Sequence, residues 1–260
     1  VLIAGGMESM TNAPYLMLKG RGGYRMGHDK IYDHMMLDGL EDAYEAGRSM
    51  GTFGEDCAAK YNFTREAQDK FAMASVERAK AATASGAFAA EITPVTVKER
   101  AGDRVVSIDE GPGKVKLDKV TSLRPAFKKD GTITAASSSS INDGAAALVM
   151  MRESTAKKLG CTPLARIVSH ATFAQEPEWF TTAPVGATQQ ALARAGWKVG
   201  DVDLWEVNEA FAVVPMALMH ELKVPHEIVN INGGACALGH PIGASGARII
   251  VTLMHALKAK

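Results

Sequence analysis

The chain has 260 residues, enough for one large domain or two small ones. Its 29 basic and 29 acidic side chains cancel, and 47% of its residues are hydrophobic, which is typical of a globular protein and excludes collagen-like, coiled-coil and disordered chains. A net charge of zero offers no general attraction to nucleic acid or to an anionic membrane, so we expect neither as a partner. An anionic ligand would have to be bound by local groups.

No apolar run approaches the roughly 18 residues of a membrane-spanning helix. Three cysteines, Cys57, Cys161 and Cys236, fit neither a disulfide framework nor the ligand spacing of a zinc site. They indicate free thiols in a reducing compartment, and we expect a cytoplasmic protein without a metal. The chain opens directly on the apolar run 1–4 and closes within a helical pattern, so we expect it to be truncated at both ends.

Residues 1–4 predict a buried strand, and the change of composition after Met10 predicts an insertion that extends to about Thr134. The firmest element of this insertion is a helix over 65–85, with Thr64 as its N-cap and Gly86 at its exit. Apolar and polar residues alternate over 91–108, which predicts short strands, and residues 109–119 predict a charged loop.

From Ile141 onward, strand and helix patterns alternate, which predicts a mostly parallel sheet with helices on both faces. The first strand of this part is a continuous apolar run and should be buried on both faces. The expected strands are 145–151, 164–173, 204–207 and 228–231. The expected helices are 154–159, 184–195, 209–222 with a kink at Pro215, and a final helix from about Ala244.

The carboxyl ends of two of these strands carry the candidate functional residues, because ligands of such sheets gather there. Asn208 follows one strand, as either a helix cap or a site residue. His240 follows the other and stands between Gly239 and Pro241. The proline holds His240 on extended backbone and the glycine frees the chain before it, a geometry that projects the imidazole into a cleft as a base or hydrogen-bond donor.

Other chemistries find less support in the residues. The glycines from Gly233 to Gly246 complete neither a dinucleotide-binding nor a Walker-type motif, although a phosphate at the following helix remains open. Cys236 lies four residues before His240, but that spacing in a glycine-rich loop does not place a thiol within reach of its base, and cysteine is a favoured buried residue. The residues themselves therefore predict a base without a nucleophile.

Four motifs, in order along the whole chain, resemble the thiolase family, with the closest similarity to its acetyl-CoA C-acetyltransferase (acetoacetyl-CoA thiolase) branch. They are Gly5-Gly6-Met7-Glu8-Ser9-Met10, Asn142-Asp143-Gly144-Ala145-Ala146, Asn208-Glu209-Ala210-Phe211, and Asn232-Gly233-Gly234-Ala235 continuing through Gly239-His240-Pro241-Ile242-Gly243-Ala244-Ser245-Gly246.

The resemblance implies an α/β fold of five layers, αβαβα, present here in part and interrupted by an inserted loop domain. Residues 1–11 would end the N-terminal core half, and 12–140 would form the loop domain, with CoA-binding and oligomer contacts. Residues 141–161 would return to the first half, and 162–260 would form a truncated C-terminal half. A homodimer or homotetramer is implied.

The resemblance also implies an acyltransferase that condenses two acetyl-CoA molecules to acetoacetyl-CoA and reverses the reaction by thiolysis. Coenzyme A and acetyl-CoA would be substrates, with no permanently bound cofactor. His240 would be base and oxyanion donor, and Asn208 would hold a water in the oxyanion hole. Both family cysteines would lie outside this chain. The residues implied for acyl-CoA binding are Leu40, Met50, Ser139, Ala210 and Phe211.

Three alternatives remain. Residues such as Met50 favour the short-chain type, but a degradative 3-ketoacyl-CoA thiolase of fatty-acid oxidation stays open. The chain alone could be an inactive CoA-binding fragment, because it lacks the family cysteines. A nucleotide-binding α/β domain is a third alternative, which binding of NAD or ATP without competition by CoA would support.

Overall fold

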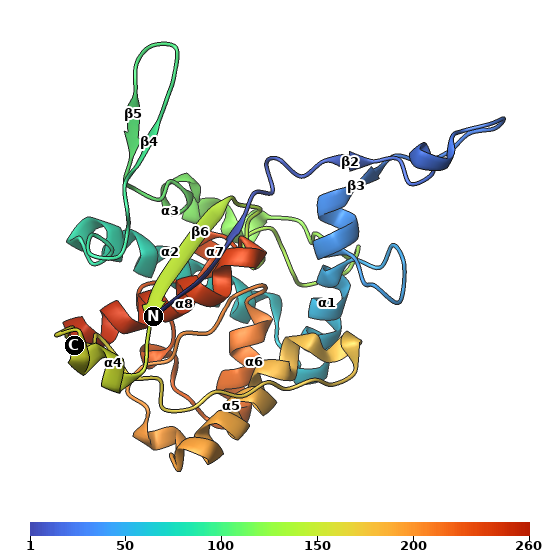
Figure 1. The fold of residues 1–260 in the computed structure, drawn as a ribbon. Helices are drawn as coiled ribbons and strands as arrows, with labels where there is room; N and C mark the ends of the chain where they lie inside the picture. Colours follow the sequence, from blue (N-terminus) through green and yellow to red (C-terminus); the bar gives the residue numbers. More distant parts are fainter.

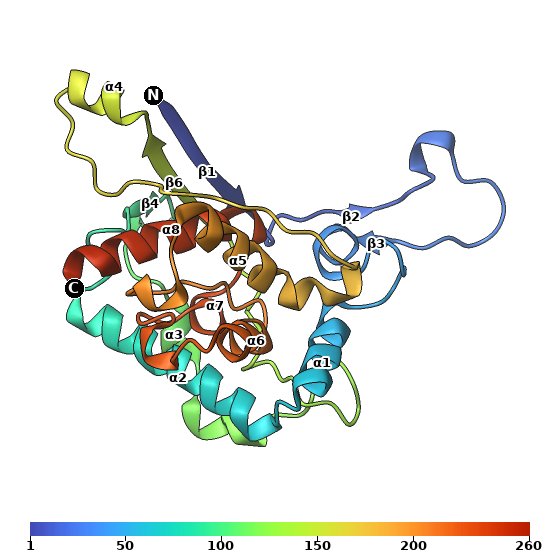
Figure 2. The ribbon, with the colours of Figure 1, turned by 90° about the horizontal axis from the view of Figure 1, so that it is seen from below.

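The computed structural model describes residues 1–260, and its central feature is a long helix against a two-stranded sheet. The sheet pairs β1 (Leu2–Glu8) with β6 (Gly144–Met150) in antiparallel orientation, with Gly6 opposite Ala146. Helix α8 (Ile242–Ala259) lies against both strands (Figures 1 and 2). This packing brings the two ends of the chain and its middle into one unit.

Seven further helices surround this unit or lie in the connections between its parts. They are α1 (Met50–Tyr61), α2 (Arg65–Ser85), α3 (Gly111–Lys114), α4 (Glu153–Lys158), α5 (Ala183–Ala195), α6 (Val213–Leu222) and α7 (Ala235–Leu238). Two hairpins extend away from the body in Figure 1. They pair β2 (Tyr15–Leu16) with β3 (Tyr32–Asp33), and β4 (Val95–Val97) with β5 (Arg104–Val106).

The helix ends follow the local signals in the sequence. The Thr64 side chain accepts a hydrogen bond from the Ala67 amide and begins α2, and Gly86 ends it at φ 77°. Gly196 ends α5 in the same left-handed region, where glycine has no steric penalty. The predicted helices over 65–85 and 184–195 are confirmed. The segment expected as a loop over 109–119 instead contains the short helix α3.

The prediction that the first strand of the second part is buried on both faces was wrong. Half-buried and exposed residues alternate along β6, because α8 covers only one face of its sheet. Residues 164–173, expected as a strand, form none and pair with no neighbouring strand. Apolar composition alone therefore misidentified this segment.

The expected mostly parallel sheet is also wrong, since every strand pair of the structure is antiparallel. Of the predicted parallel strands 204–207 and 228–231, only the bridge between Trp205 and Val229 forms. Asn230 adopts a left-handed φ of 47° and ends the extended backbone there. Its side-chain amide then bonds to both backbone groups of Val207, taking the place of the next ladder residue.

Helix α6 begins at Val213, four residues later than predicted, because the chain before it is bound elsewhere. The Ser139 amide donates to the Ala210 carbonyl over 3.1 Å, and the Ala212 amide donates to the Ser137 carbonyl over 2.8 Å. Residues 210–212 are thereby held against residues 137–139 and outside the helix. Pro215 consequently falls in the first turn of α6, where a proline needs no hydrogen-bonded amide.

The largest buried apolar cluster lies where α1, α6 and residues 127–133 meet. Its members are Cys57, Ala58, Ile133, Phe211, Val213, Val214 and Ala217. This cluster fixes the segment that follows Asn208. None of the helices combines the length and hydropathy needed to cross a membrane.

Candidate functional site

The structure brings Asn208 and His240, which are 32 residues apart, into direct contact. The Asn208 side-chain nitrogen Nδ2 lies 3.2 Å from His240 Nε2. Asn208 follows the Trp205–Val229 bridge, and His240 occupies the junction between α7 and α8. Gly239 turns the chain at φ 86°, and a Cβ there would collide with the side-chain amide of Asn142. The Gly239-His240-Pro241 sequence therefore does position an imidazole beside a polar partner.

Both ring nitrogens of His240 have partners. Its Nδ1 lies 2.6 Å from Ser245 Oγ in the first turn of α8. Burial of the ring lowers the pKa of His240, and the positive charge of Arg248 lowers it further. The imidazole is therefore neutral near pH 7, the state in which it can accept a proton. Ser245 was not identified as a site residue from sequence.

Asn208 is held by its two chain neighbours. Val207 is bound through its backbone to the Asn230 side chain, and the buried carboxylate of Glu209 accepts a 2.7 Å bond from Asn230 Nδ2. The same carboxylate accepts from Ser75 Oγ over 2.7 Å and from the Cys236 amide over 2.9 Å. These contacts fix the backbone of Asn208, and they were missed because each joins distant parts of the chain.

Asn208 and His240 line a cavity of about 380 Å³. Its apolar residues are Phe180, Pro184, Trp205, Val207, Ala210, Val214, Leu218 and Ile249. The Asn208 Oδ1 atom is buried without a hydrogen-bond partner. The cavity thus combines an apolar wall with a base and an amide, the composition expected of a small-molecule site.

Glu206 also lines this cavity and is paired with Arg248 from α8. The two charged groups are 2.9 Å apart, and the Glu206 side chain is 3% exposed. Burial raises the pKa of Glu206 to about 7, although Arg248 acts in the opposite direction. Charge at this edge of the site therefore changes within the physiological pH range.

The other residues implied for acyl-CoA binding fall into two groups. Ala210 lines the cavity, and Ser139 Oγ donates to the Ala210 carbonyl over 3.0 Å. Leu40, Met50 and Phe211 do not line it. Leu40 ends a short π-helical turn, and Met50 and Phe211 meet in the buried cluster between α1 and α6.

These outer residues are nevertheless connected to the site. A Cβ at Gly39, beside Leu40, would lie 3.1 Å from Cδ1 of Ile242 at the start of α8. The Phe127 ring packs edge-on against Phe211 at 5.7 Å, and Gly51 gives it room at the start of α1. Residues from the insertion therefore approach the elements that hold His240 and Asn208.

None of the three cysteines makes a hydrogen bond to His240. Cys236 and Cys57 are buried, and burial raises the pKa of both thiols, with Glu209 adding to the effect at Cys236. Cys161 is exposed and follows α4. The geometry within this chain thus presents a base without an adjacent nucleophile.

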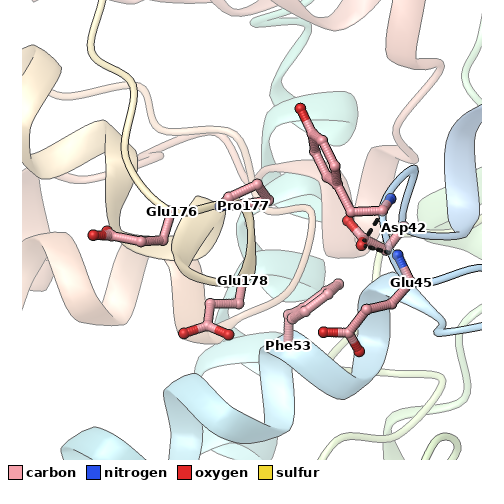
Figure 3. A pocket seen from close by; sticks show the side chains of 7 residues that line it. Asp42, Glu45, Phe53, Glu176, Pro177 and Glu178 are labelled. Atoms are coloured by element: carbon pink, nitrogen blue, oxygen red, sulfur yellow. Dashed lines mark hydrogen bonds between the residues drawn. The ribbon is translucent and has the colours of Figure 1, made fainter.

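A second cavity, of about 500 Å³, is lined mainly by acidic side chains (Figure 3). Its lining includes the carboxylates Asp42, Glu45, Glu176 and Glu178 around Phe53. The Asp42 carboxylate accepts hydrogen bonds from the Tyr44 and Glu45 amides. Four carboxylates disfavour an anionic ligand, so this cavity does not suit one.

Comparison with known proteins gives two matching family models that together span the chain. The model described as "Thiolase, N-terminal domain" matches residues 1–154, and that described as "Thiolase, C-terminal domain" matches residues 161–260. The protein named acetyl-CoA acetyltransferase from Escherichia coli K12 is 51% identical over the whole of this chain, which spans 66% of that relative.

Solved structures show the same likeness. The structure of acetyl-CoA acetyltransferase from Syntrophomonas wolfei matches with a TM-score of 0.94 and 41% identity, over 99% of this chain and 66% of that one. A thiolase from Ascaris suum in complex with coenzyme A matches with a TM-score of 0.92 and 42% identity, over 98% of this chain and 65% of that one. These matches confirm the predicted fold class, and the chain belongs to the thiolase family.

Proposed function

We propose that the complete protein containing this chain is an acetyl-CoA C-acetyltransferase. It would condense two acetyl-CoA molecules to acetoacetyl-CoA and free CoA, and catalyse thiolysis in reverse. The observation that carries the proposal is the contact between Asn208 and the neutral, buried imidazole of His240 in a cavity with an apolar wall. The similarity to proteins named acetyl-CoA acetyltransferase supports the choice of acyl group.

The neutral imidazole explains the first step. His240 Nε2 removes the proton from a cysteine thiol that this chain does not contain, and the thiolate attacks the thioester carbonyl. The resulting imidazolium donates Nε2–H to the oxyanion, and a water held by Asn208 donates to the same oxygen. The tetrahedral intermediate then expels CoA thiolate and leaves an acyl-enzyme. A second cysteine outside this chain moves the α-proton of the next acetyl-CoA.

Five further residues are assigned to the binding of the acyl-CoA substrate. We assign Ala210 and Phe211 to the wall behind Asn208, Ser139 to a hydrogen bond with the pantetheine, and Leu40 and Met50 to the pantetheine and acyl pocket. The contact of Gly39 with Ile242 supports this assignment for Leu40, since it brings the insertion to the start of α8. The Ascaris suum thiolase was solved in complex with coenzyme A, which supports CoA esters as ligands.

The division into parts also belongs to the proposal. Residues 12–140 would form a loop domain inserted into a core half that consists of residues 1–11 and 141–161. The pairing of β1 with β6 supports this division, because it joins the two sides of the insertion. Residues 162–260 would belong to the other core half. A homodimer or homotetramer follows from the family resemblance.

The decisive experiment measures thiolysis by the complete protein on acetoacetyl-CoA and on 3-ketodecanoyl-CoA, each with CoA. We expect efficient cleavage of the shorter substrate, and preference for the longer one would instead indicate a degradative 3-ketoacyl-CoA thiolase. His240→Ala and Asn208→Ala should each lower kcat by about 100- to 1,000-fold, the usual effect of losing an oxyanion-hole donor.

Matched controls keep this test specific. His255→Ala removes a histidine from the same helix without touching the cavity, and Asn12→Ala removes an exposed asparagine. Both control proteins should retain full activity. Equal losses in the controls and the site variants would contradict the roles assigned to His240 and Asn208.

A further inference from the structure

Ser245 lies in the first turn of α8 and is 4% exposed. Its hydroxyl makes two contacts. The Oγ atom is 2.6 Å from His240 Nδ1 and 3.0 Å from the backbone carbonyl oxygen of Pro241. This side chain is the only hydrogen-bond partner of His240 Nδ1, and the reaction proposed for the protein gives it no role.

Both contacts of the Ser245 hydroxyl are hydrogen bonds at the same time in only one arrangement. The Pro241 carbonyl can only accept, so the single hydroxyl hydrogen of Ser245 is used to donate to it. The hydroxyl oxygen must then accept from His240, which requires a hydrogen on Nδ1. A neutral imidazole carries one N–H, and its Nε2 is therefore left as an unprotonated acceptor.

The contact of the other ring nitrogen, Nε2, independently favours the same tautomer. Asn208 Nδ2 is a donor, and it lies 3.2 Å from His240 Nε2. A hydrogen on Nε2 would place two donors against each other, whereas a lone pair there accepts from the amide. The Nδ1–H tautomer therefore satisfies the contacts of both ring nitrogens together.

We propose that Ser245 is a positioning residue that holds His240 in the Nδ1–H tautomer, with the Nε2 lone pair directed toward Asn208 and the cavity. The tautomer itself does not depend on the reaction. Its catalytic consequence rests on the proposed function, in which Nε2 must be free to take a thiol proton. In the other tautomer Nε2 would carry a hydrogen and could not act as the base.

The choice of a serine rather than a carboxylate has a chemical consequence. A carboxylate at Nδ1 would fix the same tautomer but would also stabilise the imidazolium. The neutral hydroxyl orients the ring without adding charge, and Arg248 nearby disfavours the cation. The imidazolium that forms after proton transfer is thus left ready to return its proton.

The direct test is ¹⁵N solid-state NMR of the complete protein with labelled histidine, because the two neutral tautomers differ in their nitrogen shifts. His240 is assigned by the signal that disappears in His240→Gln. We expect the wild-type protein to show protonated Nδ1 and unprotonated Nε2 at pH 8. Protonated Nε2 in the wild type would overturn the proposal before any serine variant is made.

Variants then test the role of the hydroxyl. Ser245→Ala should yield a mixture of tautomers at His240, and Ser245→Thr, which retains a hydroxyl able to bond the carbonyl four residues back, should restore the wild-type signal. Thr83→Ala is the matched control, because Thr83 donates to the Ala79 carbonyl in the same way but far from any histidine of the site. A single unchanged tautomer in Ser245→Ala would assign the control of the tautomer to another group and overturn the proposal.

Kinetics separate positioning from general stability. In Ser245→Ala, kcat for thiolysis should fall about tenfold while KM stays within about twofold. The variant leaves Nδ1–H of His240 without a partner, which affects His240 as the base and not the binding of substrate. Ser245→Thr should recover most of kcat, and Thr83→Ala should match the wild type. If the wild-type protein shows the expected tautomer but no thiolysis, the proposed function fails and the tautomer assignment stands.

Discussion

Glu209 shows at the residue scale how much of the site depends on a group that never touches the cavity. It is fully buried, and its carboxylate accepts hydrogen bonds from Ser75, Asn230 and the Cys236 amide. Gly234 packs against it so closely that a Cβ there would collide with the carboxyl group. Three separate segments are therefore joined through one side chain next to Asn208.

The variant Glu209→Gln should consequently lower the free energy of unfolding by about 1–3 kcal/mol, because its amide group would face donors and leave one of them unsatisfied. Urea unfolding followed by circular dichroism measures this loss. The matched control is Glu99→Gln, which removes a carboxylate from an exposed pair with Arg104 and should leave the midpoint unchanged. Equal midpoints for both variants would contradict the role given to Glu209.

The titration of Glu206 makes the stability of the folded protein depend on pH. Its pKa rises from 4.5 to about 7 in the folded protein, chiefly through burial. Between these values the folded state binds a proton that the unfolded state releases, so the stability contributed by this group falls as pH rises. This loss of stability is absent below pH 4.5 and complete above about pH 7.

Glu206→Gln removes this titration. The free energy of unfolding of the variant, relative to that of the wild type, should therefore increase by about 3 kcal/mol between about pH 4.5 and pH 8. Urea unfolding at several pH values measures the difference, in which the titration of His240 cancels because it is common to both proteins. A constant difference across this range would show that Glu206 is ionised throughout.

The local backbone around His240 could be predicted from the sequence, whereas the residues that support the site could not. Glycine before the histidine and proline after it are local signals, and Gly239 indeed takes a positive φ. Glu209 and Asn230 carry no such signal, because a charged or polar residue in isolation is expected at the surface. Their roles arise only from contacts across 21 to 134 residues, as in the bonds from Asn230 and Ser75 to Glu209.

At the scale of elements, the position of α8 depends on a close approach to β1. A Cβ at Gly6 would collide with the carbonyl oxygen of Gly243, and a Cβ at Gly243 would collide with that of Met7. The Gly243 amide also donates to Glu8 Oε2 over 3.2 Å. The glycines in these two motifs therefore allow backbone contact between the strand and the helix that follows His240.

Gly6→Ala should separate the two elements and lower the free energy of unfolding by about 1–3 kcal/mol, as overpacking does. Gly246→Ala is the control in the same helix, because nothing lies within 4 Å of its added Cβ. It should raise stability by about 0.5–1 kcal/mol through the helix preference of alanine. Thermal unfolding distinguishes the two, and a loss of stability in both would contradict the importance of this contact.

Elements with local boundaries were predictable, and those that depend on distant partners were not. Helix α2 has the capping residue Thr64, α5 has a proline in its first turn, and both end at a glycine. Residues 164–173 have strand composition but no strand beside them, and the strand predicted over 228–231 ends where Asn230 leaves extended backbone. Pairing requires a partner, which composition does not reveal.

At the scale of the whole molecule, the absence of a cysteine bonded to His240 leads to a prediction about the chain itself. Its three cysteines do not hydrogen-bond to His240, and two are buried with raised pKa values. We therefore expect the 260-residue chain alone to show no thiolysis of acetoacetyl-CoA in a CoA-release assay, while the complete protein is active. Measurable turnover that disappears in Cys236→Ser would identify Cys236 as a nucleophile after all.

The pairing of β1 with β6 also has a consequence for the order of folding. Glu8 pairs with Gly144 and Leu2 with Met150, so the partners are separated by 136 to 148 positions. A ribosome adding about 5–20 residues per second needs roughly 7–30 s to make this interval. During that time β6, the strand that pairs with β1 here, is not yet made, whereas α2 already has α3 within reach. The contact between α2 and α3 can thus form before β1 and β6 pair.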